Sequence, residues 1–381
     1  MKKLLLMLPA MRMGGAEKIA LNFIPHLAEH FDLTVALNKL EGELLSDIPE
    51  GVRVIEDRLL SFGEIVRSDI KRFRIGKLLR DMAYYLRVKR GANNERNYRY
   101  LISRTPALDE EFDIAISYVA NVSTQIFSAI DRTRAKKKLA WIHGETTELS
   151  DTDLFLECYS SFDGIYCVSG VTREHFISRF PTLSDRTDVY YNPQRCDVIL
   201  KRSEELCDLP FSNEEFNILS VGRITPEKGY AMIPKMARIL LDKGHRAHFY
   251  IVGDGPSRAE VENGINELGV CDYVTLLGTK TNPYPYMKAC DVYVQPSYEE
   301  GYSTTVCEAG ILGCAIIGTT TSGGIREQVE DGVSALIAEP TPDSLADAVE
   351  RLINDPALCK TLRENVKKID FSNIDEIKKL I

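Results

Sequence analysis

Two glutamates eight residues apart are the strongest candidates for chemistry in this sequence. Glu300 lies on a loop that follows a short β-prone run, 291–295, and Glu308 lies about one turn into a helix that we expect to open at Ser303 and Thr304. Open α/β sheets bind ligands beyond the carboxyl ends of their strands, and helix starts favour phosphate. Because exposed glutamates are usually solvated surface, the pair needs support from the rest of the chain.

Two cations follow another predicted strand, 216–221. Gly222 permits close approach of a ligand to the backbone, and Arg223 and Lys228 lie at the expected edge of the sheet. Two fixed cations suit a diphosphate, which Arg can bind in bidentate fashion. The alternative is one surface arginine and one helix-end lysine. We favour the diphosphate site because of its place after a strand.

Two further candidates stay open on the residues alone. Lys280 lies on a strand-end loop, 278–284, that could present backbone groups and a cation to a base, although a plain connecting loop fits equally well. His143 ends the predicted strand 138–142, where it could carry a proton or donate a hydrogen bond, or serve as a structural loop histidine.

The sequence favours neither a metal site nor a nicotinamide site. Asp151 and Asp153 form a D-x-D pair, but they precede a predicted helix, 154–159, where acidic residues cap the first turn. Histidines and cysteines lack zinc spacing. Gly253 begins half of a dinucleotide fingerprint, but Arg258 stands where its third glycine belongs.

The elements alternate between strand and helix in two series, which predicts an α/β protein with two Rossmann-like parallel-sheet domains facing across a cleft. Irregular polar residues from 192 to about 210 separate the series and read as a linker. Ligands favour such domain interfaces. The strands that we expect are 3–8, 32–37, 52–55, 112–117, 138–142, 163–168, 187–191, 216–221, 247–252, 273–277, 291–295, 315–318 and 334–338.

The composition excludes several classes of protein. The 381 residues carry a net charge of −9, which argues against nucleic-acid binding by the protein as a whole. The nine cysteines include no C-x-x-C, so we expect reduced, buried thiols in a cytoplasmic protein. The N-terminal run to Pro9 is too short for a signal peptide and reads as a buried first strand, and no run of about 18 apolar residues predicts a membrane span.

Residues 61–104 differ from the rest, with twelve Lys or Arg, four acidic residues and a local net charge of +8. Apolar residues recur there near a helical period, as in a basic amphipathic helix suited to an anionic membrane surface. A solvated helix packed on the sheet is the equal alternative. The apolar residues are Val66, Ile70, Phe73, Ile75, Leu78, Leu79, Met82, Tyr85 and Leu86.

Taken in order, these pieces resemble a retaining glycosyltransferase of family 4 with the two-domain GT-B architecture. The resemblance extends over essentially the whole chain and is strongest from 221 to 318. It implies domains at 1–195 and 196–369, with a C-terminal helix, 370–381, that packs back on the first domain. The residues that carry it are Gly14-Gly15, His143, Arg223, Lys228 and the Glu300-x7-Glu308 spacing.

The resemblance implies a role for each motif. Arg223 and Lys228 would hold the donor diphosphate, Glu308 the ribose hydroxyls and Glu300 the transferred sugar. Gly14, Gly15 and Gly222 would lie at the phosphates, His143 near the sugar and acceptor, and Lys280 at the base. The backbone of the loop and of the helix start would contact the sugar and the phosphate through Gly301, Tyr302, Ser303 and Thr304. Only Glu300 has a glutamate eight residues on, since Glu299 is followed by Cys307, which replaces the more usual aliphatic residue.

We therefore expect a transferase that moves a sugar from a UDP-sugar, without a metal or other cofactor, to a saccharide or lipid-linked acceptor. Cell-envelope or capsular polysaccharide or glycolipid synthesis is the expected setting, at the inner face of the cell membrane if residues 61–104 bind it. The alternatives are a GT-B sugar-nucleotide epimerase and a non-catalytic partner subunit of a transferase.

Overall fold

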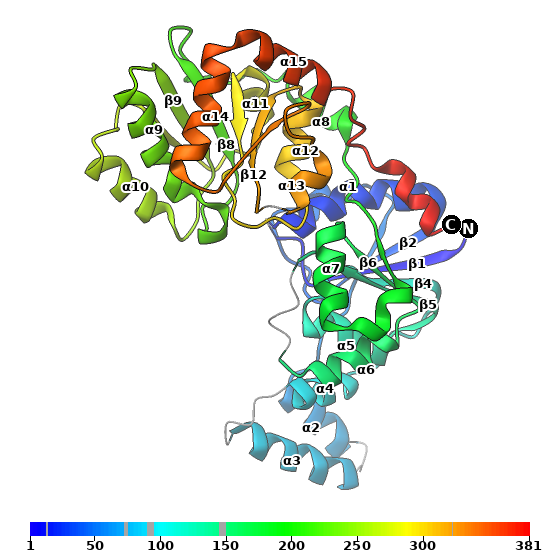
Figure 1. Cartoon of the computed structure of the whole chain (residues 1–381). Helices are drawn as coiled ribbons and strands as arrows, with labels where there is room; N and C mark the ends of the chain where they lie inside the picture. Colours follow the sequence, from blue (N-terminus) through cyan, green and yellow to red (C-terminus); the bar gives the residue numbers. More distant parts are fainter. Residues whose placement is uncertain (13, 72–74, 90–94, 145–149, 322) are drawn as a thin grey trace. The chain divides into compact units, whose positions relative to one another are not determined.

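The computed structural model describes residues 1–12, 14–71, 75–89, 95–144, 150–321 and 323–381. The chain divides into two compact units (Figure 1). Unit 1 comprises Met1–Tyr191 and Asp375–Ile381, and unit 2 comprises Asn192–Ile374. Each unit contains one parallel sheet, so the α/β class with two parallel-sheet domains is confirmed.

Unit 1 holds a seven-stranded sheet in the order β3-β2-β1-β4-β5-β6-β7. Its central strand β1 reads Lys-Leu-Leu-Leu-Met-Leu and is buried from its second residue onward, as expected of a parallel strand covered on both faces. The N-terminal run is therefore a strand, as predicted. The strands are β1 Lys3–Leu8, β2 Asp32–Leu37, β3 Arg53–Glu56, β4 Glu111–Ser117, β5 Arg134–Ile142, β6 Gly164–Cys167 and β7 Thr187–Val189.

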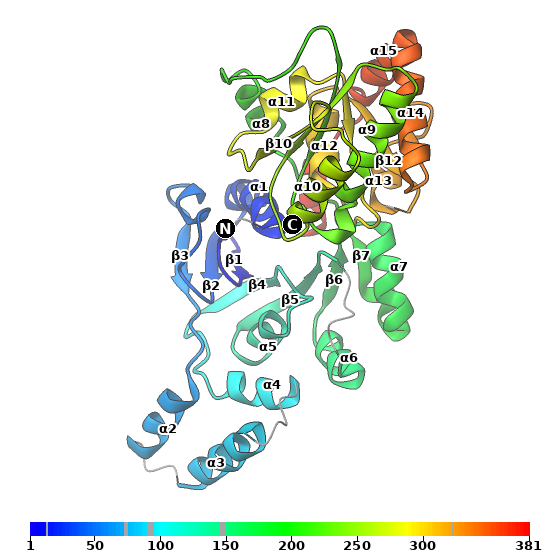
Figure 2. The ribbon, with the colours of Figure 1, turned by 90° about the vertical axis from the view of Figure 1, so that its left-hand side faces the viewer.

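Helices cover both faces of this sheet (Figures 1 and 2). The predicted capping role of Asp151 is confirmed, because its carboxylate accepts a 3.0 Å hydrogen bond from the N–H of Leu154 at the start of α6. The C-terminal residues end in the 3-10 helix η5 (Ile374–Lys379), whose Lys379 Nζ donates to Val189 O. The helices beside the sheet are α1 Gly15–His30, α5 Ser123–Asp131, α6 Thr152–Ser160 and α7 Gly170–Arg179.

Unit 2 holds a six-stranded sheet in the order β10-β9-β8-β11-β12-β13. The strands are β8 Phe216–Val221, β9 Ala247–Val252, β10 Val274–Gly278, β11 Val292–Val294, β12 Ala315–Thr319 and β13 Leu336–Ala338. The helices are α8 Cys196–Arg202, α9 Ile233–Asp242, α10 Arg258–Glu267, α11 Tyr284–Ala289, α12 Thr304–Ile311, α13 Gly323–Gln328, α14 Pro342–Asn354 and α15 Pro356–Val366.

Three expectations need correction. The stretch read as an irregular linker contains helix α8, which the turn-forming residues around it concealed. The sequence after β8 predicts a helix from Gly229 to Asp242, but helix α9 begins at Ile233, because Gly229 adopts the left-handed conformation (φ +67°) between two 3-10 turns. The cysteines are all free, but Cys207 and Cys271 are exposed rather than buried.

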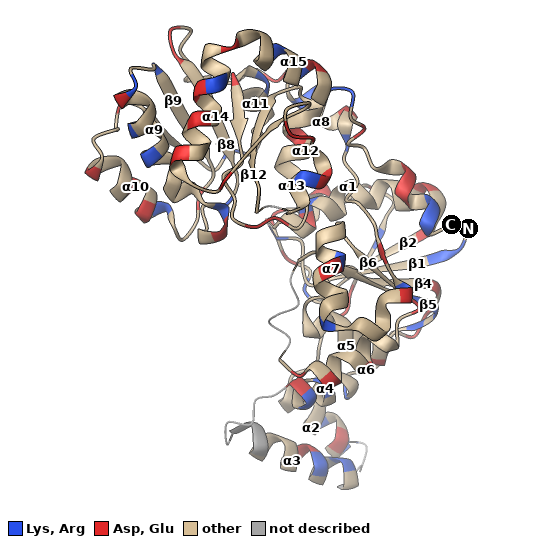
Figure 3. Ribbon diagram, viewed as in Figure 1, with Lys and Arg blue, Asp and Glu red and all other residues tan. Residues whose placement is uncertain are grey.

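The basic segment forms three helices rather than one: α2 (Phe62–Lys71), α3 (Ile75–Lys89) and α4 (Glu95–Ser103). Of the predicted apolar set, Phe73 lies outside the described residues. Both charge signs occur on these helices (Figure 3). Helix α4 packs on α5, and α2 packs on α3. The described helices are all too short or too polar to cross a membrane.

A charged cluster joins the three helices. Asp69 of α2 and Asp81 of α3 are buried, at 3% and 1% exposure, and both receive the guanidinium of Arg104, which follows α4. Tyr100 of α4 donates a 2.7 Å hydrogen bond to Asp81. Burial opposes ionisation, but the hydrogen bonds from Arg104 and Tyr100 outweigh it and lower the pKa of Asp81. Arg104 is thus the common partner of two buried carboxylates.

Replacing Arg104 by Ala leaves Asp69 and Asp81 buried without their cation. Breaking a buried pair from one side costs about 3 kcal/mol, and here we expect α2 and α3 to open locally. Hydrogen exchange of peptides from 62–103 should accelerate strongly in this variant. Arg96→Ala is the matched control, because Arg96 pairs with Asp151 at the exposed surface. Equal protection in the two variants would contradict the role assigned to Arg104.

Candidate active site

The sheet order of unit 2 marks one place where a ligand is expected. From β8 the chain proceeds to β9 on one side, and it later returns to place β11 on the other side of β8. The loops after β8 and β11 therefore leave the sheet in opposite directions and open a crevice at the carboxyl ends, which is where open α/β sheets bind ligands. The loop after β8 carries Arg223 and Lys228, and the loop after β11 carries Glu300.

The two loops contact each other directly. The N–H of Tyr298 donates to Glu227 O at 2.8 Å. A Cβ on Gly229 would lie 2.1 Å from the carbonyl oxygen of Pro296, and the φ of +67° at Gly229 would strain any other residue. Glycine at position 229 is thus required both by its conformation and by the approach of the second loop. This close approach sets Lys228 beside Glu300.

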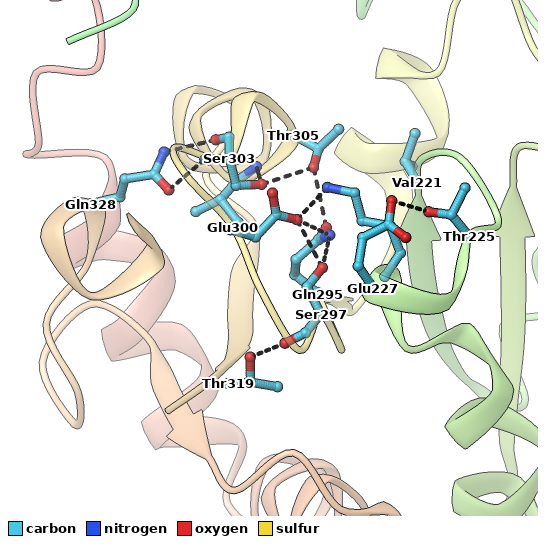
Figure 4. A network of polar contacts seen from close by, with 12 residues as sticks. Val221, Thr225, Glu227, Gln295, Ser297, Glu300, Ser303, Thr305, Thr319 and Gln328 are labelled. Atoms are coloured by element: carbon cyan, nitrogen blue, oxygen red, sulfur yellow. Dashed lines mark hydrogen bonds and ion pairs between the residues drawn. The ribbon is translucent and has the colours of Figure 1, made fainter. Parts of the chain in front are cut away.

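Glu300 is the centre of a buried polar cluster (Figure 4). It is 8% exposed, whereas its neighbour Glu299 is exposed to solvent. Its Oε1 atom accepts hydrogen bonds from Lys228 Nζ at 2.6 Å, Ser297 Oγ at 2.8 Å and Gln295 Nε2 at 2.9 Å. The ion pair neutralises the carboxylate, and the two neutral donors fix its orientation.

Gln295 is a residue of this cluster that the sequence did not single out. It is 1% exposed, and its amide lies between the core and Glu300. Its Oε1 accepts from the hydroxyls of Tyr293 and Thr305, while its Nε2 donates to Glu300. A glutamine at the end of a buried strand is the signal that could have identified it, since a buried amide must find partners.

Arg223 and Gly222 occupy the first loop as predicted, but Arg223 differs from Lys228 in its surroundings. Arg223 is exposed and makes no ion pair with any described residue, whereas Lys228 is partly buried and paired. Gly222 has φ +157°, and a Cβ there would lie 2.7 Å from the hydroxyl of Tyr230. That hydroxyl is buried with no partner among the described residues. Arg223 is therefore available to an anion without breaking an existing contact.

The loop after β11 continues into helix α12, whose first turn is capped. Ser303 is the N-cap, and its Oγ accepts from the N–H of Val306 at 3.4 Å. The N–H of Ser303 donates to Gln328 Oε1 at 3.2 Å. The helix gives no intrahelical partner to the N–H groups of Thr304 and Thr305. Backbone donors at this helix start are thus Thr304 and Thr305 rather than Ser303.

Glu308 lies on α12 in a second polar group. The hydroxyl of Tyr284 donates to Glu308 Oε1 at 3.2 Å, and burial, together with the charge of Glu308, raises the pKa of Tyr284. The guanidinium of Arg202, on the unpredicted helix α8, lies 5.5 Å from the Tyr284 ring centroid. Lys280 Nζ lies 5.9 Å from the Tyr286 ring. Glu308 and Lys280 therefore lie on elements that contact the same helix, α11.

The remaining predicted residues belong to unit 1. The loop after β1 ends at Gly14, and Gly15 is the first residue of α1; β1 and β4 flank the switch point of this sheet. Gly14 precedes α1 as its N-cap, with extended backbone. His143 follows β5 and is partly buried, with its ring 4.7 Å from that of Tyr118. Its Nε2 atom is buried and lacks a partner among the described residues.

The polar groups of unit 2 suit the binding of an anion. Within the described ranges, His, Cys, Asp and Glu side chains form no group of three or more that could hold a metal ion. One carboxylate is held by a lysine, a second carboxylate is held by a tyrosine, and an exposed arginine lies on the same loop as the lysine. Such a set can bind a diphosphate and the hydroxyls on either side of it.

Comparison with known proteins agrees with this chemistry. Residues 202–369 match the family model "Glycosyl transferases group 1". An α-D-kanosaminyltransferase from Streptomyces kanamyceticus is 34% identical over 152 residues, which span 39% of this chain and 39% of that protein. A match along nearly the whole length, 96% of this chain and 94% of the relative at 24% identity, is the N-acetylgalactosamine-N,N'-diacetylbacillosaminyl-diphospho-undecaprenol 4-alpha-N-acetylgalactosaminyltransferase of Campylobacter jejuni.

Solved structures share the fold of the complete chain. Anabaena HepE, crystallised with UDP and glucose, aligns with a TM-score of 0.73 at 17% identity and covers 100% of this chain and 98% of its own. WaaG, a glycosyltransferase of lipopolysaccharide biosynthesis, aligns with a TM-score of 0.61 at 14% identity, over 98% of both chains. The GT-B fold class is confirmed, and the matches together support a glycosyltransferase.

The surroundings of His143 predict an unusual titration. Burial lowers its pKa to about 4, opposed by a hydrogen bond to the backbone of Tyr118. The imidazole is then neutral at pH 7, and its ring signals in NMR spectra should titrate near pH 4. The unfolded chain takes up this proton below about pH 6.5, so stability falls as the pH drops from there towards 4.

His143→Gln assigns the signal and should flatten this pH dependence of stability. A His143 resonance that titrates between pH 6 and 7 in the folded protein would contradict a desolvated ring that stays neutral.

Proposed function

We propose that the protein is a retaining glycosyltransferase of family 4 that moves a sugar from a UDP-sugar to a saccharide or lipid-linked acceptor. The Lys228–Glu300 cluster at the switch point of unit 2 carries this proposal. Two features of relatives support the substrates: HepE was crystallised with UDP and glucose, and the Campylobacter relative is named for an acceptor on diphospho-undecaprenol. Synthesis of a cell-envelope or capsular polysaccharide or a glycolipid is the corresponding role.

The donor diphosphate binds between the two loops of unit 2. Arg223 is exposed and unpaired among the described residues, so it can bind the diphosphate in bidentate fashion. Lys228 Nζ carries three protons and donates one to Glu300 at 2.6 Å, which leaves the others for a phosphate oxygen. Preorganised donors of this kind are worth about 3 kcal/mol each in stabilising the charge of a leaving group.

The carboxylates take the hydroxyls on either side of the diphosphate. Glu300 binds the transferred sugar through its Oε2 atom, because its Oε1 atom already accepts three protein hydrogen bonds. Glu308 binds the ribose, with Tyr284 occupying its Oε1, and Lys280 lies on the loop for the base.

Backbone contacts come from Gly301, Tyr302 and the helix start at Thr304. The expected backbone contact of Ser303 is reassigned to Thr304, since Gln328 already binds the N–H of Ser303.

The reaction is a front-face displacement at the anomeric carbon. The bond from that carbon to the diphosphate oxygen breaks while a bond to the acceptor hydroxyl oxygen forms on the same face. The hydroxyl proton passes to the departing diphosphate, whose charge Arg223 and Lys228 stabilise. In unit 1, Gly14 and Gly15 serve the phosphates. His143 lies near the transferred sugar and the acceptor. The chemistry proceeds through these groups without a bound metal.

Substitutions in the cluster test the transfer reaction. Lys228→Ala and Glu300→Gln should each lower kcat/KM for UDP-sugar turnover by about 100-fold, because each removes a preorganised polar contact in the site. Lys235→Ala, an exposed lysine on α9, is the control and should leave turnover unchanged. The assay measures nucleotide release and identifies products with and without an acceptor.

The products separate the proposed reaction from other activities. An isomerised sugar nucleotide formed without acceptor would show an epimerase. Absence of turnover, with stimulation of a separate transferase, would show a partner subunit. Folded Lys228→Ala and Glu300→Gln variants with full turnover would refute the assigned site.

We also propose that α2 and α3 contact an anionic membrane surface. Leu79, Met82, Ala83 and Leu86 are exposed on one face of α3, at the i, i+3, i+4, i+7 spacing, and Asp81 faces inward. The exposure of Leu79 is 65% and that of Met82 is 51%. An apolar stripe turned to solvent beside exposed Lys77 and Arg80 fits the boundary between headgroups and acyl chains.

Flotation with liposomes tests this surface. Binding to phosphatidylglycerol-containing vesicles should exceed binding to phosphatidylcholine vesicles and should weaken as salt rises. Both the combined Leu79→Ser, Met82→Ser and Leu86→Ser variant and the Lys77→Glu, Arg80→Glu variant should lose binding. Leu200→Ser with Leu206→Ser, exposed leucines of unit 2, is the matched control. Salt-insensitive flotation, or unchanged flotation of the α3 variants, would refute the proposal.

A further inference from the structure

Helix α13 holds the loop of Glu300 at both of its ends. At the first end, the N–H of Gly324 donates to Glu300 O at 3.2 Å. A Cβ on Gly324 would lie 2.2 Å from Gly301 O, so α13 packs directly on the loop backbone. At the other end, Gln328 binds Ser303. Gly324 and Gln328 are four residues apart and thus lie on the same face of the helix.

The contact of Gln328 with Ser303 is bidentate. Its Oε1 accepts from the N–H of Ser303 at 3.2 Å, and its Nε2 donates to the C=O of Ser303 at 2.7 Å (Figure 4). One amide side chain therefore pairs both polar groups of a single backbone residue, as a neighbouring strand would. Nε2 also lies 2.9 Å from Cys307 Sγ, within α12. Gln328 is 5% exposed and Ser303 is 2% exposed, so water cannot readily replace these bonds.

The clamped residue joins two parts of the proposed site. Glu300 and Tyr302 precede Ser303, and the first turn of α12 follows it. Fixing both polar groups of Ser303 restricts the orientation of its two peptide planes, which sets the N–H direction of Thr304 and the position of the loop that carries Glu300. Another side-chain contact of the loop is that of Asn373, whose Nδ2 donates to the hydroxyl of Tyr302 at 3.0 Å.

We infer that Gln328 is a positioning residue for the sugar and phosphate contacts of the donor. It holds the loop and the helix start while making no contact of its own with the donor. This inference rests on the proposed function for its kinetic consequence, but its structural consequence can be measured without any substrate. Because α13 also binds Glu300 O, a displacement of α13 moves the loop that carries Glu300 and the first turn of α12 together.

Two substitutions of Gln328 isolate the clamp. Gln328→Met preserves the length and packing of the side chain and removes both hydrogen bonds. Gln328→Glu preserves an acceptor for the N–H of Ser303 but sets a carboxylate oxygen against the C=O of Ser303. Arg326→Met, at an exposed position of the same helix, is the matched control.

Hydrogen exchange without ligand is the first measurement. Peptides that span 298–311 should exchange about 30-fold faster in Gln328→Met than in the wild type and in Arg326→Met, because the two lost hydrogen bonds together are worth about 2 kcal/mol. Unchanged exchange would overturn the inference, whatever the protein's activity.

Steady-state kinetics well below the unfolding temperature is the second measurement. Gln328→Met and Gln328→Glu should raise KM for the nucleotide sugar by about 10-fold, whereas affinity for free UMP should change far less, since UMP lacks the sugar and the β-phosphate. A purely structural role lowers the active fraction, and hence the apparent kcat, at constant KM. Constant KM would therefore overturn the positioning role. A wild-type protein that turns over no nucleotide sugar would refute the proposed function. The hydrogen-exchange result would then decide by itself whether Gln328 holds the loop and the helix start.

Discussion

The ion pair between Lys228 and Glu300 is the interaction around which unit 2 is arranged. A carboxylate that is 8% exposed is costly unless it is paired and hydrogen-bonded, and three donors on one oxygen meet that cost. The pairing requires the loops after β8 and β11 to touch, which in turn requires glycine at position 229 opposite the carbonyl of Pro296. Glu300 thus keeps a fixed orientation with one oxygen uncommitted to the three donors.

The surrounding shell turns this local contact into a rigid platform. Gln295 connects Glu300 to the core hydroxyl of Tyr293, and Gln328 connects the same loop to α13. Each glutamine uses its amide oxygen and nitrogen at once, so a change at either one disturbs partners on two sides. Catalytic groups need such support because a displacement of about 1 Å can cost about 100-fold in rate. This support accounts for the buried polar side chains at the carboxyl ends of β8 and β11.

A second set of buried charges has a different effect in unit 1. Asp69 and Asp81 both form ion pairs with Arg104. A helical subdomain would ordinarily bury apolar residues at such positions. Two buried carboxylates therefore lie beside the buried Ile65 in this subdomain, while Leu79 and Met82 face solvent. Amphipathic helices that lie on a membrane need this arrangement, because the apolar face is reserved for the lipid. The charge excess of 61–104 is also smaller in effect than its count suggests, since Arg96 and Arg99 pair with acidic residues outside the segment.

Local patterns in the sequence determined the alternation of strands and helices, because runs such as Leu4–Leu8 and Phe216–Val221 show their burial in their composition. They also determined the positions of Arg223, Lys228, Glu300 and Glu308 at strand ends and a helix start. Tertiary structure decided what each group faces: that Lys228 pairs with Glu300, that Tyr284 holds Glu308, and that Ser303 is engaged by Gln328. Those contacts join residues 24 to 72 positions apart. Side chains at such separations meet only through sheet order and loop packing, and local periodicity predicts neither. The orientation of α3 could not be predicted for the same reason. A helical period shows that a helix has an apolar face, but the pairing of Asp81 with Arg104 decides that this face is exposed to solvent.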